Sequence, residues 1–296
     1  MRRLKTLAVI GAGLIGGSFA MALRRAGAVS SVVGFDRDGA ALERAAALGV
    51  IDTVAGSVSE AAKGADLVVV AVPVRAIGPV LRDVALSIDA GAVVTDVGST
   101  KGDVQRTARA ELRDRIARFV PGHPIAGRET SGVDAATADL FRGARVVLTP
   151  GPETAADAVE VVRGAWEAAG GRVVTMAADD HDRIFAAVSH LPHLLAFALV
   201  SEIAAREGCA ELLRFAGGGF RDFTRIAASS PEMWRDIALQ NREALLAELD
   251  RFGAQLAVFR ELVDKGDGPG LERLMAEARA SRQSLGAGAR RGSSQE

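Results

Sequence analysis

The sequence is poor in cysteine, in tyrosine and in excess charge. Its 296 residues include one cysteine, Cys209, no tyrosine and only 4% aromatic residues. A single cysteine excludes an internal disulfide framework and favours a reducing compartment, so we expect a cytoplasmic protein. Acidic residues number 37 and basic residues 36, for a net charge of −1. This balance argues against a bulk nucleic-acid binder and against a protein held on an anionic membrane.

Long uninterrupted apolar runs are also missing. The basic N-terminus and the apolar run that follows it to Leu23 resemble a signal peptide, but glycines at positions 11, 13, 16 and 17 interrupt the run. Such glycines weaken a signal or membrane helix and fit a strand–turn–helix unit better. No other stretch reaches about 18 uninterrupted apolar residues, so we expect no transmembrane helix.

The first half of the chain has the pattern of an α/β fold. Short apolar runs alternate with helical patterns up to residue 177, which is typical of a doubly wound, Rossmann-type sheet. We expect strands at 7–10, 31–35, 67–72, 92–95, 118–120, 145–149 and 172–175, with 118–120 and 145–149 as later strands of the same sheet. Helices are expected at 14–26, 39–48, 77–86 and 154–169.

The second half predicts helices alone. Helical patterns cover 189–206, 231–259 and 269–285 with no strand run between them. At roughly 150 residues per domain, the length also suits two domains. We therefore predict a Rossmann-type domain over 1–177, an all-helical domain over 178–285 and a disordered Gly/Ser/Arg-rich tail over 286–296.

A glycine-rich turn follows the first strand. Gly11, Gly13 and Gly16 form a G-x-G-x-x-G pattern between a strand and a helix. In this pattern the first glycine permits a tight turn, the second lets a pyrophosphate approach the backbone, and the third lets helix and strand pack closely. The helix that begins at Leu14 and Ile15 offers free N–H groups to phosphates. The segment therefore predicts a dinucleotide site.

The second strand ends in an acid. Asp36 lies 20 residues after the last glycine of the turn, where a carboxylate accepts hydrogen bonds from the adenosine ribose and repels a 2′-phosphate. This favours NAD over NADP, although Arg37 and Arg24 leave a partner for a phosphate nearby. Val72 and Pro73 end the 67–72 strand and are expected beside the adenosine or pyrophosphate.

A hydride-transfer site also needs a group that takes a proton. Two segments after later strands carry suitable groups, DVGSTK at 96–101 and GHPIAG at 122–127. His123 lies on an expected loop between glycine and proline, and with an unperturbed pKa of about 6.5 its ring is a base near pH 7. Ser99 is expected to orient that ring or to share the substrate hydroxyl. The competing interpretation of His123 is a surface histidine.

The other three histidines fall in the helical half. His190 and His193 are three residues apart and would share one helix face. Because no further Cys, His or carboxylate stands at ligand spacing, we predict no metal site and expect a substrate cleft there. His181 lies in the acidic string 179–182 and is expected at a solvated helix N-terminus.

A second glycine cluster, at 217–219, precedes a charged segment. Arg225 is a candidate to bind a substrate carboxylate through its two-pronged guanidinium. Asp222, three residues earlier, would hold that guanidinium when no substrate is bound. A surface salt bridge at a loop-to-helix junction is the alternative.

Together these segments resemble one family, the prephenate/arogenate (cyclohexadienyl) dehydrogenases of tyrosine biosynthesis. The matching segments, in family order, are GAGLIGGS at 11–18, DVGSTK at 96–101, HPIAGRETSG at 123–132, DLFRGARVVLTP at 139–150, SHLPH at 189–193, GGGFRDFTRIA at 217–227 and MWRDI at 233–237. The first is common to dinucleotide folds. The 123–132, 189–193 and 217–227 segments together are specific to the family, and the resemblance spans residues 4 to about 285.

The resemblance implies roles for individual residues. His123 becomes the catalytic base or acceptor for the ring hydroxyl, and Ser99 orients it. Arg225 binds a substrate carboxylate within an ionic network of acids. Trp234 resembles a residue that reaches the partner subunit's site. The implied substrate-binding residues are Arg225, His190, His193, Glu129, Thr130, Asp222 and Trp234.

The resemblance also implies an activity, a cofactor and an assembly. The activity is oxidative decarboxylation of prephenate to 4-hydroxyphenylpyruvate, or of arogenate to tyrosine, with NAD rather than NADP. The helical domain resembles the family's dimerisation domain, so a homodimer is expected. Prephenate and arogenate differ only in a keto or amino group, and both remain candidate substrates.

Three rival interpretations remain. One is a dehydrogenase for 4-amino-4-deoxyprephenate. Another is a β-hydroxyacid-type dehydrogenase, which would need a catalytic lysine in the helical half, where only Lys265 occurs. The third is a non-catalytic NAD sensor that forms a dimer, against which the presence of Ser99, His123 and Arg225 argues.

Overall fold

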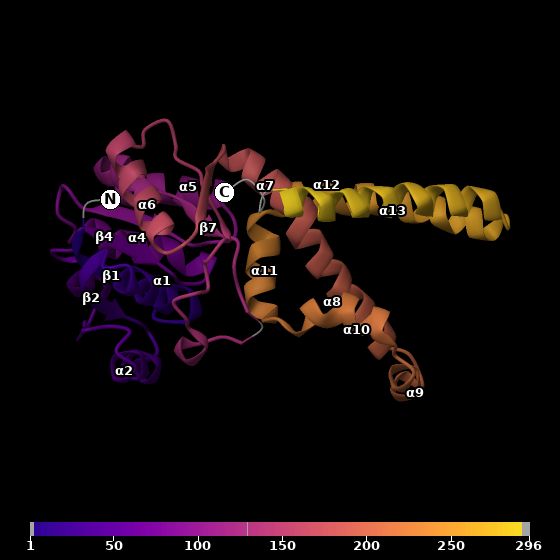
Figure 1. The fold of residues 1–296 in the computed structure, drawn as a ribbon, viewed down its shortest axis with the longest axis horizontal. Coiled ribbons are helices and arrows are strands. Elements are labelled where there is room, and N and C mark those ends of the chain that lie inside the picture. Colours follow the sequence, from indigo (N-terminus) through magenta and orange to yellow (C-terminus); the bar gives the residue numbers. More distant parts are fainter. Residues whose placement is uncertain (1–2, 129, 292–296) are drawn as a thin grey trace. The chain divides into compact units, whose positions relative to one another are not determined.

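The computed structural model describes residues 3–128 and 130–291, with the backbone alone for 285–291. The chain divides after Leu245 into two compact units. The first contains both sheets and every helix up to α11, and the second contains most of α12 and all of α13 (Figure 1).

A six-stranded parallel sheet forms the centre of the first unit, in the order β3-β2-β1-β4-β5-β6. Its strands are β1 (Leu4–Ile10), β2 (Val29–Phe35), β3 (Thr53–Val54), β4 (Leu67–Val70), β5 (Val93–Asp96) and β6 (Phe119–Val120). The order reverses between β1 and β4, and in open α/β sheets the ligand crevice lies at such a point. The predicted Rossmann-type architecture is confirmed.

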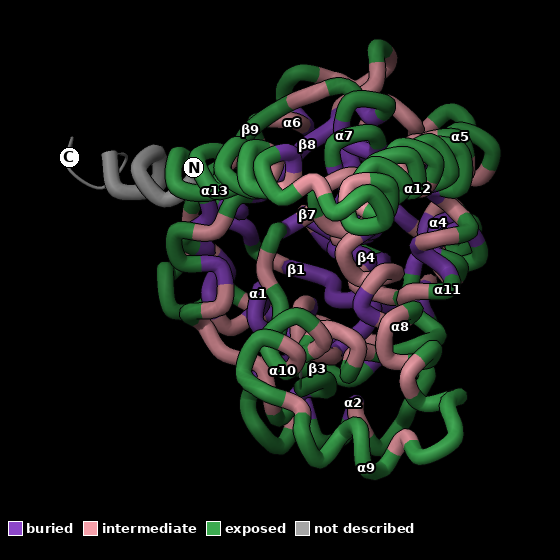
Figure 2. The backbone as a smooth tube through the Cα atoms, turned by 90° about the vertical axis from the view of Figure 1, so that its right-hand side faces the viewer, coloured by how far each residue is buried: buried purple, intermediate pink, exposed green. Residues whose placement is uncertain are grey.

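Helices cover both faces of this sheet. They are α1 (Leu14–Arg25), α2 (Gly39–Ala47), α3 (Val58–Ala62), α4 (Ile77–Ala85), α5 (Gly102–Leu112) and α6 (Ala156–Ala168), with the short 3₁₀ turns η1 (Val74–Ala76), η2 (Arg113–Arg118) and η3 (Val133–Ala135). Alternate strand residues enter opposite cores: Leu7 and Val9 pack with α1 and α6, whereas Ala8 and Ile10 pack with α3, α4 and α5. Figure 2 shows β1 and β4 buried between these layers.

Three later strands form a separate sheet, which corrects one prediction. The strands β7 (Gly122–Pro124), β8 (Arg145–Leu148) and β9 (Arg172–Thr175) pair in that order, β7 antiparallel and β9 parallel to β8. The expectation that 145–149 continues the first sheet is therefore wrong. Pro121 has no N–H to extend the β5–β6 ladder, so the chain leaves the first sheet there. As a result His123 lies on a strand and not on a loop.

The helices that follow remain part of the first unit. They are α7 (Ala178–Phe185), the π-helical turn η4 (Ala186–His190), α8 (Leu191–Ala204), α9 (Cys209–Arg214), α10 (Gly218–Thr224), the 3₁₀ turn η5 (Arg225–Ala228) and α11 (Pro231–Gln240). The Asp182 carboxylate accepts hydrogen bonds from Lys101 N and Gly102 N, each at 2.8 Å. Thr100 Oγ1 donates to Gln240 Oε1 at 2.9 Å. Because of these bonds, the compact unit extends past the predicted boundary at 177/178.

The second unit consists of two long helices. They are α12 (Arg242–Asp264), which begins in the first unit, and α13 (Gly268–Arg291). A single helix had been expected over 231–259, but the helix is interrupted at Asn241. The tail expected to be disordered from residue 286 is helical up to Arg291, because its alanines and arginines favour helix; residues 292–296 lie outside the described range. Leu256, Val263 and Met275 are more than half exposed within this unit.

One helical run resembles a membrane span in composition. The run Ala178–Ala204 is long and apolar enough to cross a membrane by length and composition alone, with a mean hydropathy of 1.7. No such run had been expected, because no stretch beyond the N-terminal one holds about 18 uninterrupted apolar residues; here His181, Asp182 and His190 interrupt the run. The core helix of a soluble protein passes the same test. We interpret the run as part of the helical half, because these three polar residues hydrogen-bond to other parts of the first unit.

Candidate active site

The glycine turn between β1 and α1 has the geometry of a phosphate cradle. Gly11 has a φ of +99°, and a Cβ there would lie 2.3 Å from the Ala71 carbonyl oxygen. A Cβ on Gly16 would lie 2.1 Å from the Gly11 carbonyl oxygen, whereas a Cβ on Gly13 would meet nothing within 4 Å. Gly13 caps α1 without a side-chain hydrogen bond, so the first N–H groups of the helix, at Leu14 and Ile15, have no acceptor within the helix.

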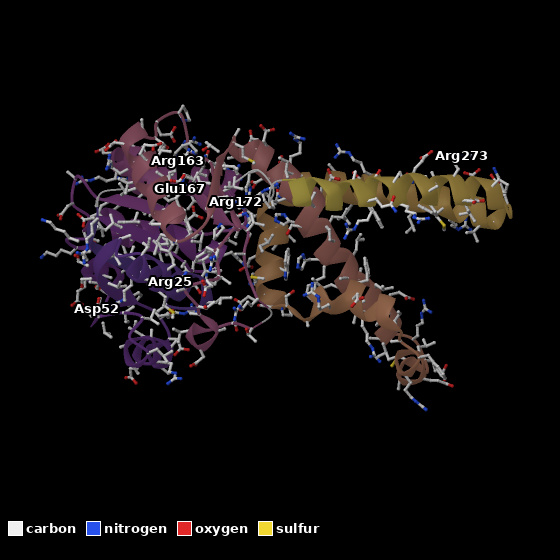
Figure 3. All side chains as sticks on the ribbon, in the orientation of Figure 1. Arg25, Asp52, Arg163, Glu167, Arg172 and Arg273 are labelled. Carbon is white, nitrogen blue, oxygen red and sulfur yellow. The ribbon has the colours of Figure 1, made fainter. Side chains whose placement is uncertain are left out.

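An acid stands at the expected place beside this turn. Asp36 Oδ2 accepts from Ala12 N and its Oδ1 accepts from Asp38 N, both at 2.9 Å. Arg37 is exposed next to it. Arg24 forms a two-pronged ion pair with Asp52, a residue labelled in Figure 3, at 2.9 and 3.0 Å. Of the two arginines considered from the sequence, Arg24 is thus paired with Asp52, and Arg37 stands next to Asp36.

The remaining predicted cofactor residues follow β4. Val72 and Pro73 lie just beyond the carboxyl end of that strand, next to β1 across the point where the strand order reverses. The Ala71 N–H donates to the Ile10 carbonyl at 2.7 Å, which holds this corner against the glycine turn. Val72 Cγ1 lies 3.2 Å from the position of a Cβ on Gly11. All the predicted cofactor residues thus lie at one edge of the sheet.

A buried ion pair supports the next corner of the same edge, and the sequence did not single it out. Lys101 Nζ donates to Asp96 Oδ2 at 2.5 Å and to the Gly122 carbonyl at 2.6 Å, and both side chains are fully buried. Asp96 Oδ1 accepts from Gly122 N at 3.1 Å. Burial lowers the pKa of Lys101, and the negative charge of Asp96 opposes that change. The pair holds both polar atoms of the Gly122 backbone and so positions His123.

His123 extends from β7 into this region. Its ring centroid lies 5.1 Å from that of His181 and 5.0 Å from that of Phe185. Burial lowers the pKa of His123 well below 6.5, and electrostatic interactions with His181, Lys101 and His190 act in the same direction. The ring is therefore neutral at pH 7. The unperturbed pKa of about 6.5 that was expected for His123 is therefore too high.

His181 corrects a second prediction. It is fully buried and not at a solvated helix N-terminus. Its Nε2 lies 2.8 Å from His123 Nδ1, and its Nδ1 lies 2.8 Å from Asp182 Oδ1. Along α7 the buried residues are Ala178, His181, Asp182 and Phe185, an i, i+3, i+4, i+7 pattern. This amphipathic spacing predicts a buried His181, whereas its acidic neighbours suggested a solvated position.

His190 and His193 lie on the helical side of the site. Asn241 Nδ2 donates to His190 Nδ1 at 3.0 Å, which leaves the proton of a neutral His190 ring on Nε2. His193 Nδ1 donates to the Ser189 carbonyl at 2.8 Å, and its ring stacks on Trp234 with centroids 3.7 Å apart. Trp234 thus packs within its own chain, and its predicted reach into a partner's site stays a prediction.

Two buried donors in this region have no hydrogen-bond partner among the described residues. They are His190 Nε2 and Trp234 Nε1, and both residues line one cavity of about 190 Å³. The other lining residues are mainly apolar: Leu194, Phe197, Pro231, Arg235, Ala238 and Leu245. Because an unpaired buried donor is costly, the cavity suits a ligand with an acceptor.

The buried histidines predict a loss of stability in acid. Burial lowers the pKa of His190 to about 4 from 6.5, so between these pH values the unfolded chain binds more protons than the folded one. Stability is therefore full above pH 6.5 and falls as the pH drops towards 4, by up to about 3 kcal/mol for this residue. The measurement is urea unfolding of wild type and of His190→Gln at pH 7 and at pH 5. The variant should lose less unfolding free energy than the wild type between pH 7 and pH 5. An equal loss in both proteins would contradict the contribution of His190.

The predicted carboxylate-binding residues lie on or near the short helices that follow α9. Arg225 begins η5, close enough to His193 for its charge to lower the pKa of that ring, on which burial acts first. Asp222 is exposed on α10, one turn before Arg225. Thr130 is exposed after β7. Glu129 lies outside the described residues, so its part in an ionic network stays a prediction.

Ser99 lies on the loop between β5 and α5, and its backbone faces the ring of His190. The structure therefore brings Ser99, His123, His181 and His190 together at the carboxyl edge of the sheet. Arg225 and His193 form a neighbouring group. The sequence missed four residues of this region: Asp96, Lys101, Asp182 and Asn241 support its histidines or the backbone beside them.

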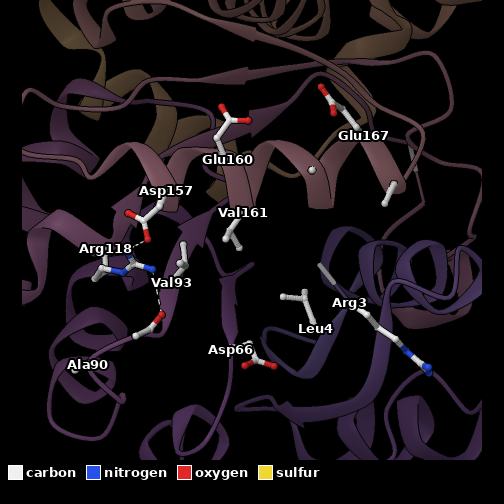
Figure 4. Close-up of a pocket in the computed structure, with 13 residues that line it drawn as sticks. Arg3, Leu4, Asp66, Ala90, Val93, Arg118, Asp157, Glu160, Val161 and Glu167 are labelled. Atoms are coloured by element: carbon white, nitrogen blue, oxygen red, sulfur yellow. Dashed lines mark hydrogen bonds and ion pairs between the residues drawn. The ribbon is translucent and has the colours of Figure 1, made fainter. Parts of the chain in front are cut away.

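A larger cavity of about 860 Å³ lies elsewhere (Figure 4). Leu4 and Val93, at the amino ends of β1 and β5, line it, so it opens at the opposite edge of the sheet from the glycine turn. Arg118 pairs there with Asp157 at 2.6 Å. No residue of the candidate active site contributes to it.

The parts described above define a class of protein. A parallel sheet with reversed strand order, a glycine turn with open space at its second glycine, and a neutral histidine at the same edge are the features of a dinucleotide-dependent dehydrogenase. A helical region completes the site on its other side.

Comparisons with known proteins identify the family within this class. Residues 19–175 match the family model described as prephenate dehydrogenase, nucleotide-binding domain, and residues 177–277 match prephenate dehydrogenase, dimerization domain. A cyclohexadienyl dehydrogenase of Zymomonas mobilis is 38% identical over 95% of this chain and 96% of its own length. A prephenate dehydrogenase of Bacillus subtilis is 39% identical over 95% of this chain and 76% of its own.

A solved structure agrees with these relatives. The prephenate dehydrogenase of Aquifex aeolicus, in complex with hydroxyphenyl propionate and NAD+, superposes with a TM-score of 0.89 at 36% identity, over 95% of this chain and 98% of that one. The chain belongs to the prephenate dehydrogenase family. The β-hydroxyacid-type alternative is thereby set aside, and the two family models meet near the predicted boundary at 177/178.

Proposed function

We propose that this chain oxidises and decarboxylates prephenate, arogenate or both, with NAD as hydride acceptor, in tyrosine biosynthesis. The observation that carries the proposal is the placement of His123, a histidine whose pKa is lowered by burial, at the sheet edge that also bears the glycine turn. Family membership supports the reaction type. The structure with NAD+ bound, to which this chain is similar, supports the cofactor.

The glycine turn fits a dinucleotide. The open space at Gly13 accommodates a pyrophosphate close to the N–H groups of α1. Asp36, fixed by Ala12 N and Asp38 N, faces the position of the adenosine ribose and disfavours a 2′-phosphate. When bound, NAD supplies the acceptor for the hydride.

The proton transfer and the orientation of the substrate are the roles of His123 and Ser99. His123 takes the proton of the C4 hydroxyl as hydride leaves C4, and Ser99 orients the hydroxyl. The ring carboxylate leaves as CO2, its bonding electrons enter the ring, and the ring becomes aromatic. The proton then returns from His123 to the phenolate oxygen of the product, so the reaction releases no net proton.

A dianionic substrate needs cationic or N–H partners. Arg225 is the group for one carboxylate, because a guanidinium binds a carboxylate through two parallel hydrogen bonds. The unpaired N–H donors of His190 and Trp234 are suited to an acceptor in the adjoining cavity. Glu129, Thr130, His193 and Asp222 complete the proposed substrate-binding set.

The low pKa of His123 predicts the pH dependence of activity. Because burial lowers this pKa well below 6.5, the base stays unprotonated throughout the neutral range. We expect kcat/KM to be flat between about pH 8 and pH 6.5 and to decline only in more acidic solution. A steady-state pH profile on protein shown to be folded tests this. If kcat/KM instead falls with decreasing pH and the midpoint of that fall lies above pH 7, the prediction is contradicted.

The experiment that tests the proposed function is a matrix of two cofactors and two substrates. Reduced nicotinamide formation is followed for prephenate and arogenate, each with NAD and with NADP. Turnover of either substrate with NAD supports the proposal, and preference for NADP would remove the role given to Asp36. If neither substrate is turned over, 4-amino-4-deoxyprephenate is tested next, and turnover of that compound would keep the fold and change the substrate. No turnover with any pair would favour the NAD sensor.

We also propose a homodimer formed through the helical half, in the cytoplasm. The match of residues 177–277 to a dimerization domain supports the dimer. So do the exposed apolar side chains of Leu256, Val263 and Met275 on two helices that cannot cover them alone. Light scattering on purified protein tests the assembly. The single cysteine supports a reducing compartment.

A further inference from the structure

A row of three hydrogen-bonded side chains begins at the proposed base and ends at a carboxylate. His123 Nδ1 lies 2.8 Å from His181 Nε2, and His181 Nδ1 lies 2.8 Å from Asp182 Oδ1. His123 comes from β7, and the other two residues come from α7. The contact between the two rings joins residues 58 positions apart in the sequence.

The direction of these hydrogen bonds follows from the carboxylate. Asp182 also accepts from Lys101 N and Gly102 N, each at 2.8 Å. Burial raises the pKa of Asp182, but these bonds and the bond from His181 outweigh it, and the pKa is lowered. An ionised carboxylate only accepts hydrogen bonds, so the proton of this contact lies on His181 Nδ1.

The protonation of His181 determines the direction of its hydrogen bond with His123. Burial lowers the pKa of His181 although Asp182 opposes the change, so this ring carries one proton, on Nδ1. Its Nε2 therefore has a free lone pair, and His123 must donate to it from Nδ1. Since the His123 ring is also neutral, its Nε2 has no proton.

The other charged groups near the two rings do not disturb this arrangement. Lys101 faces both, but its donors go to Asp96 and to the Gly122 carbonyl. Asp96 is occupied by Lys101, Gly98 N and Gly122 N. His190, the remaining neighbour of His123, receives its Nδ1 hydrogen bond from Asn241.

We propose that His181 and Asp182 are positioning residues that hold His123 as the Nδ1–H tautomer and so present a bare Nε2 to the substrate hydroxyl. Free histidine prefers the opposite tautomer, with the proton on Nε2, which cannot accept the hydroxyl proton. The pair also stabilises the imidazolium of His123 once it has taken the proton, because the charge of Asp182 is relayed through His181. This inference rests on the proposed function for its kinetic consequence but not for the tautomer.

The first test reads the tautomer directly. The full chain is labelled with 15N-histidine. Long-range two-dimensional 1H–15N spectra, which correlate each ring nitrogen with the protons on the ring carbons, are recorded at pH 7. The sequence has four histidines, so single substitutions assign every signal. We expect a pyrrole-type shift for His123 Nδ1 and a pyridine-type shift for Nε2. A pyrrole-type Nε2 of His123 in the wild type would overturn the proposal. The variants serve only to assign the signals, and the tautomer is read on the wild type.

The second test compares two substitutions of His181. His181→Leu removes the acceptor at similar size, whereas His181→Gln places an amide oxygen near the former Nε2. We expect the leucine variant to lose about 10- to 100-fold in kcat with KM within about threefold. The glutamine variant should recover most of that loss. Equal losses in both, or a loss confined to KM, would mean a structural role only and would overturn the proposal.

The two hypotheses fail in different ways. If the wild type turns over none of the candidate substrates, the proposed function fails, and the spectra still decide the tautomer. If the wild type is active and His123 carries its proton on Nε2, the positioning role fails and the proposed function stands.

Discussion

His123→Asn is expected to lower kcat by about 10²- to 10⁴-fold and to leave KM for the substrate and for NAD within about threefold. The reason is that His123 makes its proton transfer in the transition state, whereas the substrate carboxylates and the dinucleotide are held by other residues. Asparagine fills part of the same space without a basic nitrogen. Initial rates at saturating substrate and cofactor measure the effect.

The control for this variant is its cofactor binding. NAD affinity, measured by titration, should equal that of the wild type, because the glycine turn and Asp36 lie apart from β7. Thermal unfolding establishes that the variant is folded. A variant that keeps wild-type kcat, or that loses KM and kcat together, would remove His123 from the role of base.

Arg225→Gln is expected to have the opposite pattern, a KM for prephenate or arogenate raised by roughly 10- to 100-fold with kcat changed by less than about fivefold. A hydrogen bond to a charged group contributes about 1.5 to 3 kcal/mol, and each 1.4 kcal/mol corresponds to about tenfold in affinity. Because the carboxylate is bound in both the ground state and the transition state, the loss should appear in KM.

The chain offers a matched control for Arg225. Arg221 is an exposed arginine on α10, one turn before Arg225, so Arg221→Gln removes the same charge from the same segment. It should leave KM within about twofold. Equal increases in both variants would indicate that only the general positive field matters, and a fall in kcat alone for Arg225→Gln would contradict a binding role.

The sequence was sufficient for the parts of the fold that depend on local pattern. The turn at Gly11–Gly16, the helices α1, α2 and α4, and the four central strands were each found within a few residues. In these elements the hydrophobic period and the glycine spacing both act over short distances. The pairing of β8 with β7 was missed because strand partners are chosen by tertiary packing, which a strand's own residues do not encode.

The same distinction applies to the site. His123, Ser99 and the glycine turn were found from motifs and from their place after strands. His181 was misplaced because its acidic neighbours suggested solvent, whereas α7 buries that face against β7. Asn241 was missed because it lies inside a helical pattern. Its side chain instead hydrogen-bonds the Asp182 carbonyl and His190, where the helix breaks.

The stoichiometry of the reaction distinguishes oxidative decarboxylation from a dehydrogenation that releases no CO2. Wild-type protein is incubated with a limited amount of prephenate and excess NAD, and NADH, CO2 and the aromatic product are quantified together, with His123→Asn as the inactive reference. We expect one NADH and one CO2 for each prephenate consumed, with 4-hydroxyphenylpyruvate as the product, and the corresponding yield of tyrosine if arogenate is the substrate. Folded protein that forms no NADH with either compound, or that forms NADH without CO2, would contradict this expectation.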